Sequence, residues 1–297
     1  MKITVFTPTF NRGYIIEKLY RSLQAQTFTD FEWLVIDDGS EDNTMELFKR
    51  WMADTNPFTI RYFKVENGGK HRAINKATDL AKGELFFIVD SDDTLTEDAL
   101  ESVVSWELGL ENKAAYCAVA GNKGISEKDL WGTTFDGSYM DATSLEREKY
   151  NITGDKAEVF FTKVIKEYKF CEFEGESFIT ECTVWDKMAA DGYKIRWFNK
   201  IIYLCDYLPD GLTNSGDTVF ANNPQGTAYL YKQQIEYYKL NLKDRLSSYN
   251  AYYQLVKCNV GLKLAARYLE IHMITLVWAL FLVACKNILI GRRFLQH

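Results

Sequence analysis

The feature that most constrains the fold is a regular alternation of short apolar segments with helix-like segments over the first 120 residues. Residues 2–7 (KITVFT) form a β-branched run that stops at Pro8, which is typical of a strand. Residues 13–26 then place apolar side chains at helical spacing. The alternation continues with strands predicted at 31–37, 59–65, 84–90 and 114–120, and helices at 43–53, 70–82 and from Thr94 or Thr96 to about Leu108. Short connections between such elements predict an α/β fold, a doubly wound and mostly parallel sheet flanked by helices.

The rest of the chain has a mixed pattern. It begins with two predicted helices and two predicted strands, at 155–168, 177–191, 193–198 and 200–206. From Pro224 onward the pattern is helical to the end. We therefore predict an α/β domain over 1–215 and a helical C-terminal region over 216–297.

Composition argues against several classes of function. The net charge of -6 gives no reason to expect binding to nucleic acid. The six cysteines are dispersed without a CxxC pair and the chain has three histidines, which argues against a zinc site. Dispersed cysteines are typical of reduced thiols in a cytoplasmic protein. Met1-Lys2 leads directly into a strand pattern, which does not resemble a signal peptide.

Polar and acidic clusters stand at three predicted strand ends. Thr7–Arg12 (TPTFNR) follows the first strand, Asp37–Ser40 (DDGS) ends the second, and Asp90–Asp93 (DSDD) ends the fourth. Ligands of open α/β sheets bind at the carboxyl ends of the strands. Crowded carboxylates repel one another unless a cation neutralises them, and Mg²⁺ or Mn²⁺ is often held by one or two carboxylates plus substrate phosphates. Acidic turns also cap helices, but clusters at three strand ends favour a divalent metal with a diphosphate ligand.

The segment Asn67–Asn75 (NGGKHRAIN) places two cations in the first turn of a predicted helix. Lys70 and Arg72 oppose the helix dipole there, whereas an anion would be stabilised, so a diphosphate neighbour is predicted. A solvated basic turn is the alternative explanation. Gly68-Gly69-Lys70 is not a Walker loop, because the earlier glycine is missing and His71 replaces Ser or Thr.

These motifs, in this order and at this spacing, resemble the large family of inverting glycosyltransferases with a GT-A fold, family two. The resemblance is good over 1–120 and looser to about 215. It implies a nucleotide-sugar-binding catalytic domain and a metal-dependent hexosyltransferase. Such an enzyme transfers a sugar from a nucleoside-diphosphate sugar, with UDP expected, to a saccharide acceptor.

The same resemblance implies roles for individual residues. Asp92 is the principal ligand of Mn²⁺ or Mg²⁺, the second Asp of the family's Asp-x-Asp motif, and Asp90 contacts the metal or the ribose. The main chain around Pro8 and the side chain of Asp38 hold the nucleotide base of the donor, and Arg12 lies near the donor. The full set of predicted donor-binding residues is Thr7, Pro8, Thr9, Asn11, Arg12, Asp38, Lys70, Arg72, Asn75, Asp90 and Ser91.

The reaction also requires a base that deprotonates the acceptor hydroxyl. The family supplies an Asp from a Glu-Asp pair about twelve residues before a Gly-Tyr, and counting back from Gly192-Tyr193 reaches Thr180-Glu181. Glu181 takes the place of the Asp and is the predicted catalytic base. A solvent-facing helix position is the alternative for Glu181, and three nearby acids remain alternative bases, Glu172, Glu174 and Glu176.

The C-terminal region contains a run of thirteen uncharged residues, 273–285, flanked by Lys286, Arg292 and Arg293. Crossing a bilayer takes about 20 apolar residues, so the run favours a helix lying in the membrane interface with Trp278 near the headgroups. We predict peripheral membrane contact through 273–293; a helix buried on the core or in a homo-oligomer is the alternative. By family analogy, the acceptor is a polyprenyl-linked saccharide at the inner face of the cell membrane, in cell-surface polysaccharide synthesis.

Two other functions remain as alternatives. A sugar nucleotidyltransferase needs a glycine-rich, basic loop after the first strand, and Thr7–Arg12 lacks the glycines. A catalytically degenerate GT-A protein would bind saccharide or assemble with a partner without turnover, and the altered Thr180-Glu181 pair favours that alternative. Metal binding without sugar transfer would distinguish it from an enzyme.

Overall fold

The computed structural model describes residues 1–205 and 216–294, with side chains as far as Cys285. It divides the chain into two compact units. Unit 1 comprises Met1–Phe170 and Lys187–Leu208, and unit 2 comprises Cys171–Asp186 and Pro209–His297. The domain boundary predicted after residue 215 adjoins a segment, 206–215, that lies outside the described residues, so it stays a prediction.

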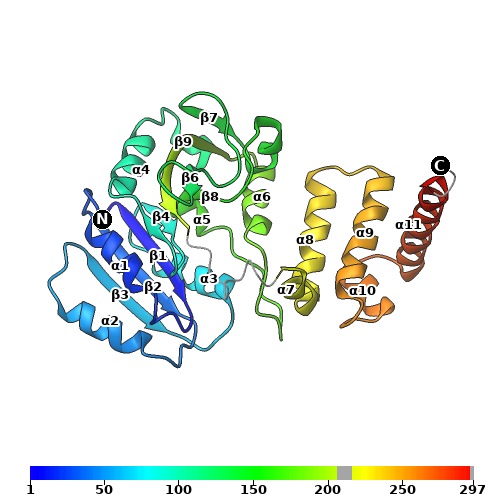
Figure 1. The fold of residues 1–297 in the computed structure, drawn as a ribbon, viewed down its shortest axis with the longest axis horizontal. Helices are drawn as coiled ribbons and strands as arrows, with labels where there is room; N and C mark the ends of the chain where they lie inside the picture. The colour runs from blue at the N-terminus through cyan, green and yellow to red at the C-terminus, as the bar shows by residue number, and fades with distance from the viewer. Residues whose placement is uncertain (206–215, 295–297) are drawn as a thin grey trace. The chain divides into compact units, whose positions relative to one another are not determined.

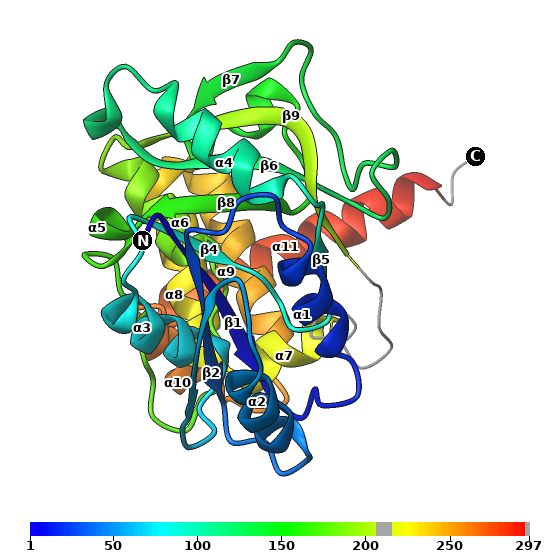
Figure 2. The same cartoon turned by 90° about the vertical axis from the view of Figure 1, so that its left-hand side faces the viewer.

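The first half of unit 1 follows the predicted alternation (Figure 1). Its strands are β1 (Ile3–Thr9), β2 (Phe31–Asp37), β3 (Thr59–Lys64) and β4 (Leu85–Ile88). They alternate with helices α1 (Glu17–Gln24), α2 (Thr44–Ala53) and α3 (Lys70–Leu80), which flank the strands in Figure 2. β1 pairs in parallel with β2 and β4, and β2 pairs in parallel with β3. The carboxyl ends of these four strands therefore lie along one edge of the sheet.

The second half of the sheet is mixed. Its strands are β5 (Thr94–Leu95), β6 (Tyr116–Gly124), β7 (Tyr139–Ala142), β8 (Lys156–Phe161) and β9 (Lys194–Leu204). They are joined by helices α4 (Ala99–Leu108) and α5 (Thr162–Ile165) and by short 3₁₀ turns at Lys113–Ala115, Ser144–Glu146 and Glu148–Tyr150. The order is β3-β2-β1-β4-β8-β6-β9-β5, with β7 on β9. β8 is antiparallel to both of its neighbours, whereas β9 is parallel to β6. The predicted fold class is confirmed, with its parallel pairing concentrated in the first half.

Two local predictions in the second half are wrong. The helix predicted over 155–168 is strand β8 followed by the single helical turn α5. β8 lies between β4 and β6, where both faces are covered, so its apolar residues show no alternation that distinguishes a strand from a buried helix. The two strands predicted over 193–206 are one strand, β9, whose pairing with β6 shifts register at irregular positions.

Large side chains fill the core between the sheet and its helices. Trp33 of β2 is fully buried and stacks on Tyr20 of α1 at 5.9 Å and on Trp51 of α2 at 6.0 Å between ring centroids. Burying one such side chain contributes about 1.5–3 kcal/mol. This packing gives the loops at the strand ends a rigid support.

Unit 2 is helical, as predicted from Pro224 onward. Its helices are α7 (Gly216–Asn222), α8 (Pro224–Tyr237), α9 (Leu242–Val256), α10 (Leu262–Tyr268) and α11 (Met273–Phe294). Helix α6 (Cys182–Ala190) contains the boundary between Asp186 and Lys187. Within the described residues, no single helix is both long and apolar enough to cross a membrane. Leu262–Tyr268 and Met273–Cys285 meet that criterion only together, as a pair bent by 106°.

Candidate functional site

The loops after β1 and β2 are joined by a ring of hydrogen bonds. The Asn11 N–H donates to Ser40 Oγ, and the Glu41 N–H donates to Asn11 Oδ1, each at 2.8 Å. The Asp38 N–H donates to the Thr9 carbonyl at 2.8 Å. Asn11 has a φ of 53°, in the left-handed region that asparagine tolerates better than most residues. Asn11 therefore fixes the two predicted loops against each other.

Asp38 organises the start of helix α3. Its two carboxylate oxygens accept the N–H groups of Gly68 and Gly69, each at 2.8 Å, and its carbonyl accepts from Asn67 Nδ2. Burial raises the pKa of Asp38, and the two glycine N–H groups oppose that shift. Gly69 has a φ of 97°, which strains any residue with a Cβ, and it precedes the first residue of α3. Asp38 thus determines where the basic first turn of α3 lies.

That basic turn contacts the acidic loop after β4. Lys70 Nζ lies 2.6 Å from Asp90 Oδ1, and both side chains are largely buried, with 26% and 30% exposure. Although burial opposes it, the charges of Lys70, Lys123 and Arg12 lower the pKa of Asp90. Asp90 is therefore held as a carboxylate by protein cations. The sequence pattern predicted a diphosphate beside Lys70 and not this ion pair, and the diphosphate contact stays a prediction.

The other two carboxylates of this loop are in a different electrostatic state. Burial and the charge of Asp90 raise the pKa of Asp92, and the same causes raise the pKa of Asp93 to about 7. The hydroxyl of Tyr203, which is fully buried in β9, donates to Asp93 Oδ2 at 2.7 Å and accepts the Asp90 N–H at 2.9 Å. Lys123 Nζ lies 4.1 Å from the centroid of the Tyr203 ring. Three carboxylates are thus crowded within a loop that one tyrosine holds in shape.

This acidic loop fits a divalent metal completed by a ligand from outside the protein. Among the described residues, no group of three or more His, Cys, Asp and Glu side chains has the arrangement of a complete metal site. Asp92 is partly exposed, and its raised pKa reflects a charge that the protein leaves poorly compensated. One or two carboxylates plus phosphate oxygens are the usual ligands of Mg²⁺.

Tyr203, Lys123 and Asp93 were not predicted as site residues. Asp93 adjoins the predicted metal ligands Asp90 and Asp92, so its place in the same acidic cluster could have identified it. Tyr203 lies 110 positions after Asp93, and no local pattern links the two. Lys123 follows the strand predicted at 114–120, in the part of β6 that the sequence pattern did not reach.

The remaining predicted residues of the β1 and β4 loops have distinct environments. Thr7 Oγ1 accepts a hydrogen bond from the buried Trp33 Nε1 at 3.0 Å, so the Thr7 side chain stabilises the core. Thr9 Oγ1 is buried and has no hydrogen-bond partner among the described residues. Such an unsatisfied hydroxyl is destabilising unless a ligand completes it. Pro8 is half-buried beside it, and Ser91 is buried.

The predicted basic and amide residues also make contacts within the protein. Arg12 Nη1 donates to the Tyr14 hydroxyl at 2.6 Å, and the Arg72 guanidinium donates to the Gly68 carbonyl. Asn75 makes a reciprocal pair with the main chain of Phe170, at 3.0 and 2.9 Å. The Asn75 amide therefore anchors the end of the first segment of unit 1, a contact that the motif alone did not indicate.

The acidic candidates for the base belong to unit 2 and differ in their surroundings. Glu176 is buried, and its carboxylate accepts the N–H groups of Gln225 and Gly226 at 2.7 and 2.8 Å, which caps the start of α8. Glu181 is half-buried and immediately precedes α6. Two further candidates are exposed, Glu172 and Glu174. Because Glu176 has a structural role, Glu181 stays the preferred prediction for the base.

Comparison with known families is decisive for the class of protein. The family model "Glycosyl transferase family 2" matches residues 4–166, which is more than half of the chain. The match includes the loops after β1, β2 and β4. This chain belongs to glycosyl transferase family 2. The predicted family membership is thus confirmed.

Individual relatives in this family cover only parts of the chain. A Campylobacter jejuni GalNAc(5)-diNAcBac-PP-undecaprenol beta-1,3-glucosyltransferase is 30% identical over 189 residues, 62% of this chain and 58% of that protein. An uncharacterized glycosyltransferase of Mycoplasma pneumoniae is 39% identical over 39% of this chain and 38% of its own length. The chain thus spans less than two thirds of these relatives.

Solved structures share the fold over most of the chain. Staphylococcus aureus TarS 1–349 in complex with UDP-GlcNAc has a TM-score of 0.61 at 19% identity, covering 94% of this chain and 89% of that one. The mannosyltransferase PcManGT of Pyrobaculum calidifontis, in complex with GDP-Man and Mn²⁺, has a TM-score of 0.56 at 19% identity, covering 97% and 87%. The predicted GT-A fold with C-terminal helices is confirmed by this likeness.

Proposed function

We propose that the protein is an inverting, metal-dependent hexosyltransferase that uses a nucleoside-diphosphate sugar, with a UDP-sugar as the expected donor. The observation that carries the proposal is the loop Asp90–Asp93, where Lys70 neutralises Asp90 and Asp92 keeps a poorly compensated charge. A divalent metal bound together with a diphosphate is the partner that such a charge distribution would favour. The UDP-GlcNAc complex of TarS and the GDP-Man and Mn²⁺ complex of PcManGT support this proposal.

In this proposal Asp92, with Asp90, holds Mn²⁺ or Mg²⁺, which stabilises negative charge on the leaving diphosphate when bound. Lys70 and Arg72 present positive charge from the first turn of α3, and Asp38 fixes that turn. The unsatisfied Thr9 hydroxyl offers one hydrogen bond to the donor. Glu181 accepts the proton of the attacking acceptor hydroxyl, and attack from the face opposite the diphosphate inverts the anomeric centre.

We further propose a lipid-linked saccharide acceptor and peripheral contact with the inner face of the membrane through 273–293. Helix α11 exposes a row of large apolar side chains, Ile274, Val277, Trp278, Phe281 and Leu282, at 44–67% exposure. An exposed apolar surface of this kind marks an interaction site, and a tryptophan with basic residues nearby in sequence suits lipid headgroups. The undecaprenol-linked acceptor in the name of the Campylobacter relative supports this choice over a homo-oligomer.

The first test is calorimetric binding of UDP and a panel of UDP-sugars, with and without Mn²⁺, to the wild type and to Asp92→Ala. The proposal predicts metal-dependent binding that the variant loses. Folded protein that binds no UDP in the presence of Mn²⁺ would overturn the UDP-sugar proposal.

A second candidate function is saccharide binding without turnover, which the altered Thr180-Glu181 pair favours. Transfer assays with Glu181→Gln separate the two. Wild-type turnover that the variant loses, with UDP binding retained, supports the enzyme. Metal-dependent UDP binding without transfer by the wild type, across the donor panel, supports the binding protein.

A further inference from the structure

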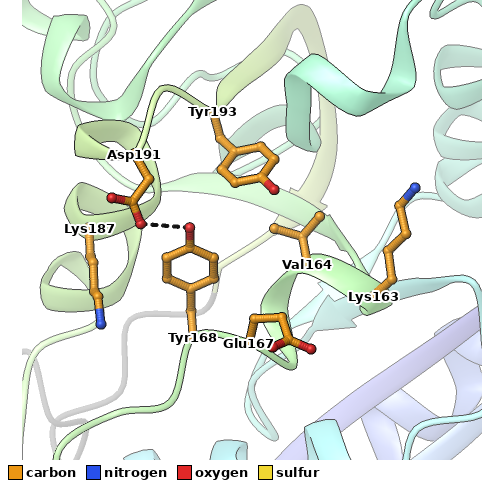
Figure 3. Close-up of a pocket in the computed structure, with 7 residues that line it drawn as sticks. All are labelled: Lys163, Val164, Glu167, Tyr168, Lys187, Asp191 and Tyr193. Carbon is orange, nitrogen blue, oxygen red and sulfur yellow. Dashed lines mark hydrogen bonds between the residues drawn. The ribbon is translucent and has the colours of Figure 1, made fainter.

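Unit 1 contains a pocket that the predicted donor-binding residues do not line. Its cavity volume is about 400 Å³, within the range of small-ligand sites. The side chains around it come from α5 and the turn after it, from α6, and from the turn before β9 (Figure 3). Val164 of α5 is buried and supplies an apolar wall.

The strand pairing places this pocket at the edge of the sheet opposite the acidic loop. Phe161, the last residue of β8, pairs with Leu85 at the start of β4, whereas Asp90 follows the end of β4. The start of β9 pairs with the start of β6, and β6 in turn pairs at Ala118 with Phe160 of β8. At about 3.3 Å per strand residue, Leu85 at the pocket's edge of the sheet is roughly 16 Å from Asp90 along the chain.

Two aromatic rings and a carboxylate shape the pocket. The rings of Tyr168 and Tyr193 are nearly perpendicular, at 88°, with centroids 6.2 Å apart. The Tyr168 hydroxyl donates to Asp191 Oδ2 at 2.7 Å, which holds that ring and the carboxylate together (Figure 3). Lys187 Nζ lies 5.8 Å from the centroid of the Tyr168 ring. Both tyrosines are half-buried, and both charged groups are exposed.

The charges of the lining cancel. The lining contains two lysines, Lys163 and Lys187, and two acids, Glu167 and Asp191. No ion pair joins any of these four side chains to another described residue. A phosphate would meet two carboxylates, and a metal ion would meet two ammonium groups. A neutral polyhydroxyl ligand satisfies donors and acceptors together, and its C–H faces pack on tyrosine rings.

We propose that this pocket is a saccharide subsite that binds an uncharged sugar segment of the acceptor, away from the reacting hydroxyl. Tyr168 and Tyr193 provide the packing surface, Asp191 accepts sugar hydroxyls, and Lys187 donates to them. This inference rests on the proposed function in one respect, that the acceptor is a saccharide. Binding in the pocket requires no turnover, so it is measured separately from transfer.

The test uses the full chain saturated with UDP and Mn²⁺, with three neutral tetrasaccharide probes: chitotetraose, cellotetraose and maltotetraose. Saturation-transfer NMR and calorimetry report binding up to about 10 mM, which covers the weak millimolar affinities expected of one subsite. Asp191→Ala should weaken binding of the preferred probe about tenfold, as loss of a charged hydrogen-bond acceptor predicts. Lys194→Ala, an exposed lysine outside the lining, is the matched control and should leave the affinity unchanged.

Tyr193→Ala serves as the second variant and should abolish binding, with circular dichroism confirming that it is folded. Lys187→Ala tests whether the pocket binds an anion instead of a sugar, with inorganic phosphate as the probe. Phosphate binding that Lys187→Ala removes, without tetrasaccharide binding, overturns the proposal, as does failure of all three probes. If UDP binding is intact while the tetrasaccharides do not bind, the subsite alone is wrong. If UDP binding also fails, the proposed function is wrong.

Discussion

The two edges of the unit 1 sheet hold charge in opposite ways. In the loop after β4, three aspartates are crowded and partly or fully buried, with Asp90 paired to Lys70 and Asp93 hydrogen-bonded to Tyr203. At the other edge, Asp191 and Lys187 are exposed, and Asp191 accepts a hydrogen bond from the Tyr168 hydroxyl. The carboxylates of the acidic loop repel one another, whereas Asp191 and Lys187 carry opposite charges.

The difference matches our two proposals, a reaction site at the first edge and a reversible binding site at the second. Buried like charges shift pKa values and destabilise the fold, so they persist where a metal or a reaction offsets them. Exposed, screened charges beside aromatic rings affect stability little and leave their hydrogen-bonding capacity for a ligand. Equivalent substitutions at the two edges should therefore have unequal consequences.

The largest contrast should come from removing one aspartate at each edge. Asp92→Ala should lower kcat/KM about a thousandfold, corresponding to roughly 4 kcal/mol of lost stabilisation, and abolish Mn²⁺-dependent UDP binding. Its thermal stability should be unchanged or higher, because repulsion from Asp90 is relieved. Asp191→Ala should keep kcat and UDP binding. Steady-state kinetics, calorimetry and thermal melts check both, and equal losses of kcat would remove the distinction between the edges.

A smaller effect should follow from deleting one tyrosine hydroxyl at each edge. Tyr203→Phe removes a buried hydroxyl that bridges Asp93 Oδ2 and the Asp90 N–H, and it should lower the free energy of unfolding by about 1–3 kcal/mol. Mn²⁺-dependent UDP affinity should fall about tenfold with it, as for other residues that orient metal ligands. Tyr193→Phe should leave the free energy of unfolding and the UDP affinity unchanged within error. Denaturant melts and UDP titrations measure these effects, and a Tyr203→Phe protein with wild-type affinity would contradict them.

The acidic loop should also make stability depend on pH. The pKa of Asp93 is raised to about 7, above its unfolded value near 4, so the folded state holds a proton that the unfolded state releases. Its stabilising contribution is present at low pH and is lost as pH rises from about 4 to 7, with a slope of at most about 1.4 kcal/mol per pH unit. UDP–Mn²⁺ affinity should rise over the same window, because the metal competes with protons.

Variants identify the group behind that slope. Asp93→Asn should flatten the decline and stabilise the metal-free protein above pH 7. Glu158, whose pKa burial also raises to about 7, adds a second contribution that Glu158→Gln removes. Asp191→Ala should leave the profile unchanged. Urea melts from pH 5 to about 8 measure it, and a decline that survives both Asp93→Asn and Glu158→Gln would refute the assignment.

The smallest contrast concerns two lysines. Lys70→Ala leaves Asp90 without its closest cation in a largely buried pair, so unfolding free energy should fall by about 1 kcal/mol. Lys187→Ala, at an exposed position, should change it by less than about 0.5 kcal/mol. Paired denaturant melts at low and high salt check this, and a larger loss for Lys187→Ala would reverse the comparison.

Local order along the chain was enough to predict which loops meet at one edge of the sheet. The strand-and-helix alternation over the first 120 residues put Thr9, Asp38 and Asp90 at strand ends, and parallel pairing requires those ends to share one edge. Lys70 lies in the first turn of α3, as predicted, and the diphosphate contact inferred from the helix dipole stays a prediction. These features depend on neighbours a few residues apart, which a sequence displays directly.

Features that depend on distant pairing could not be predicted this way. β8 was mistaken for a helix, since an apolar run covered on both faces shows no strand period and only its neighbours β4 and β6 make it a strand. The Tyr203 bridge to Asp93 joins residues 110 positions apart. The Tyr168–Asp191 contact depends on the end of β8 and the start of β9 lying at the same edge of the sheet.

The sequence by itself therefore determined the fold class, the family and the acidic loop, because each follows from short-range patterns of apolar and charged residues. Only the tertiary structure decided which groups compensate that loop, that Glu176 caps α8, and that a pocket exists at the opposite edge. The physical reason is that burial, hydrogen bonding and pKa depend on all groups within a few ångströms, and strand pairing brings most of those groups from far along the chain.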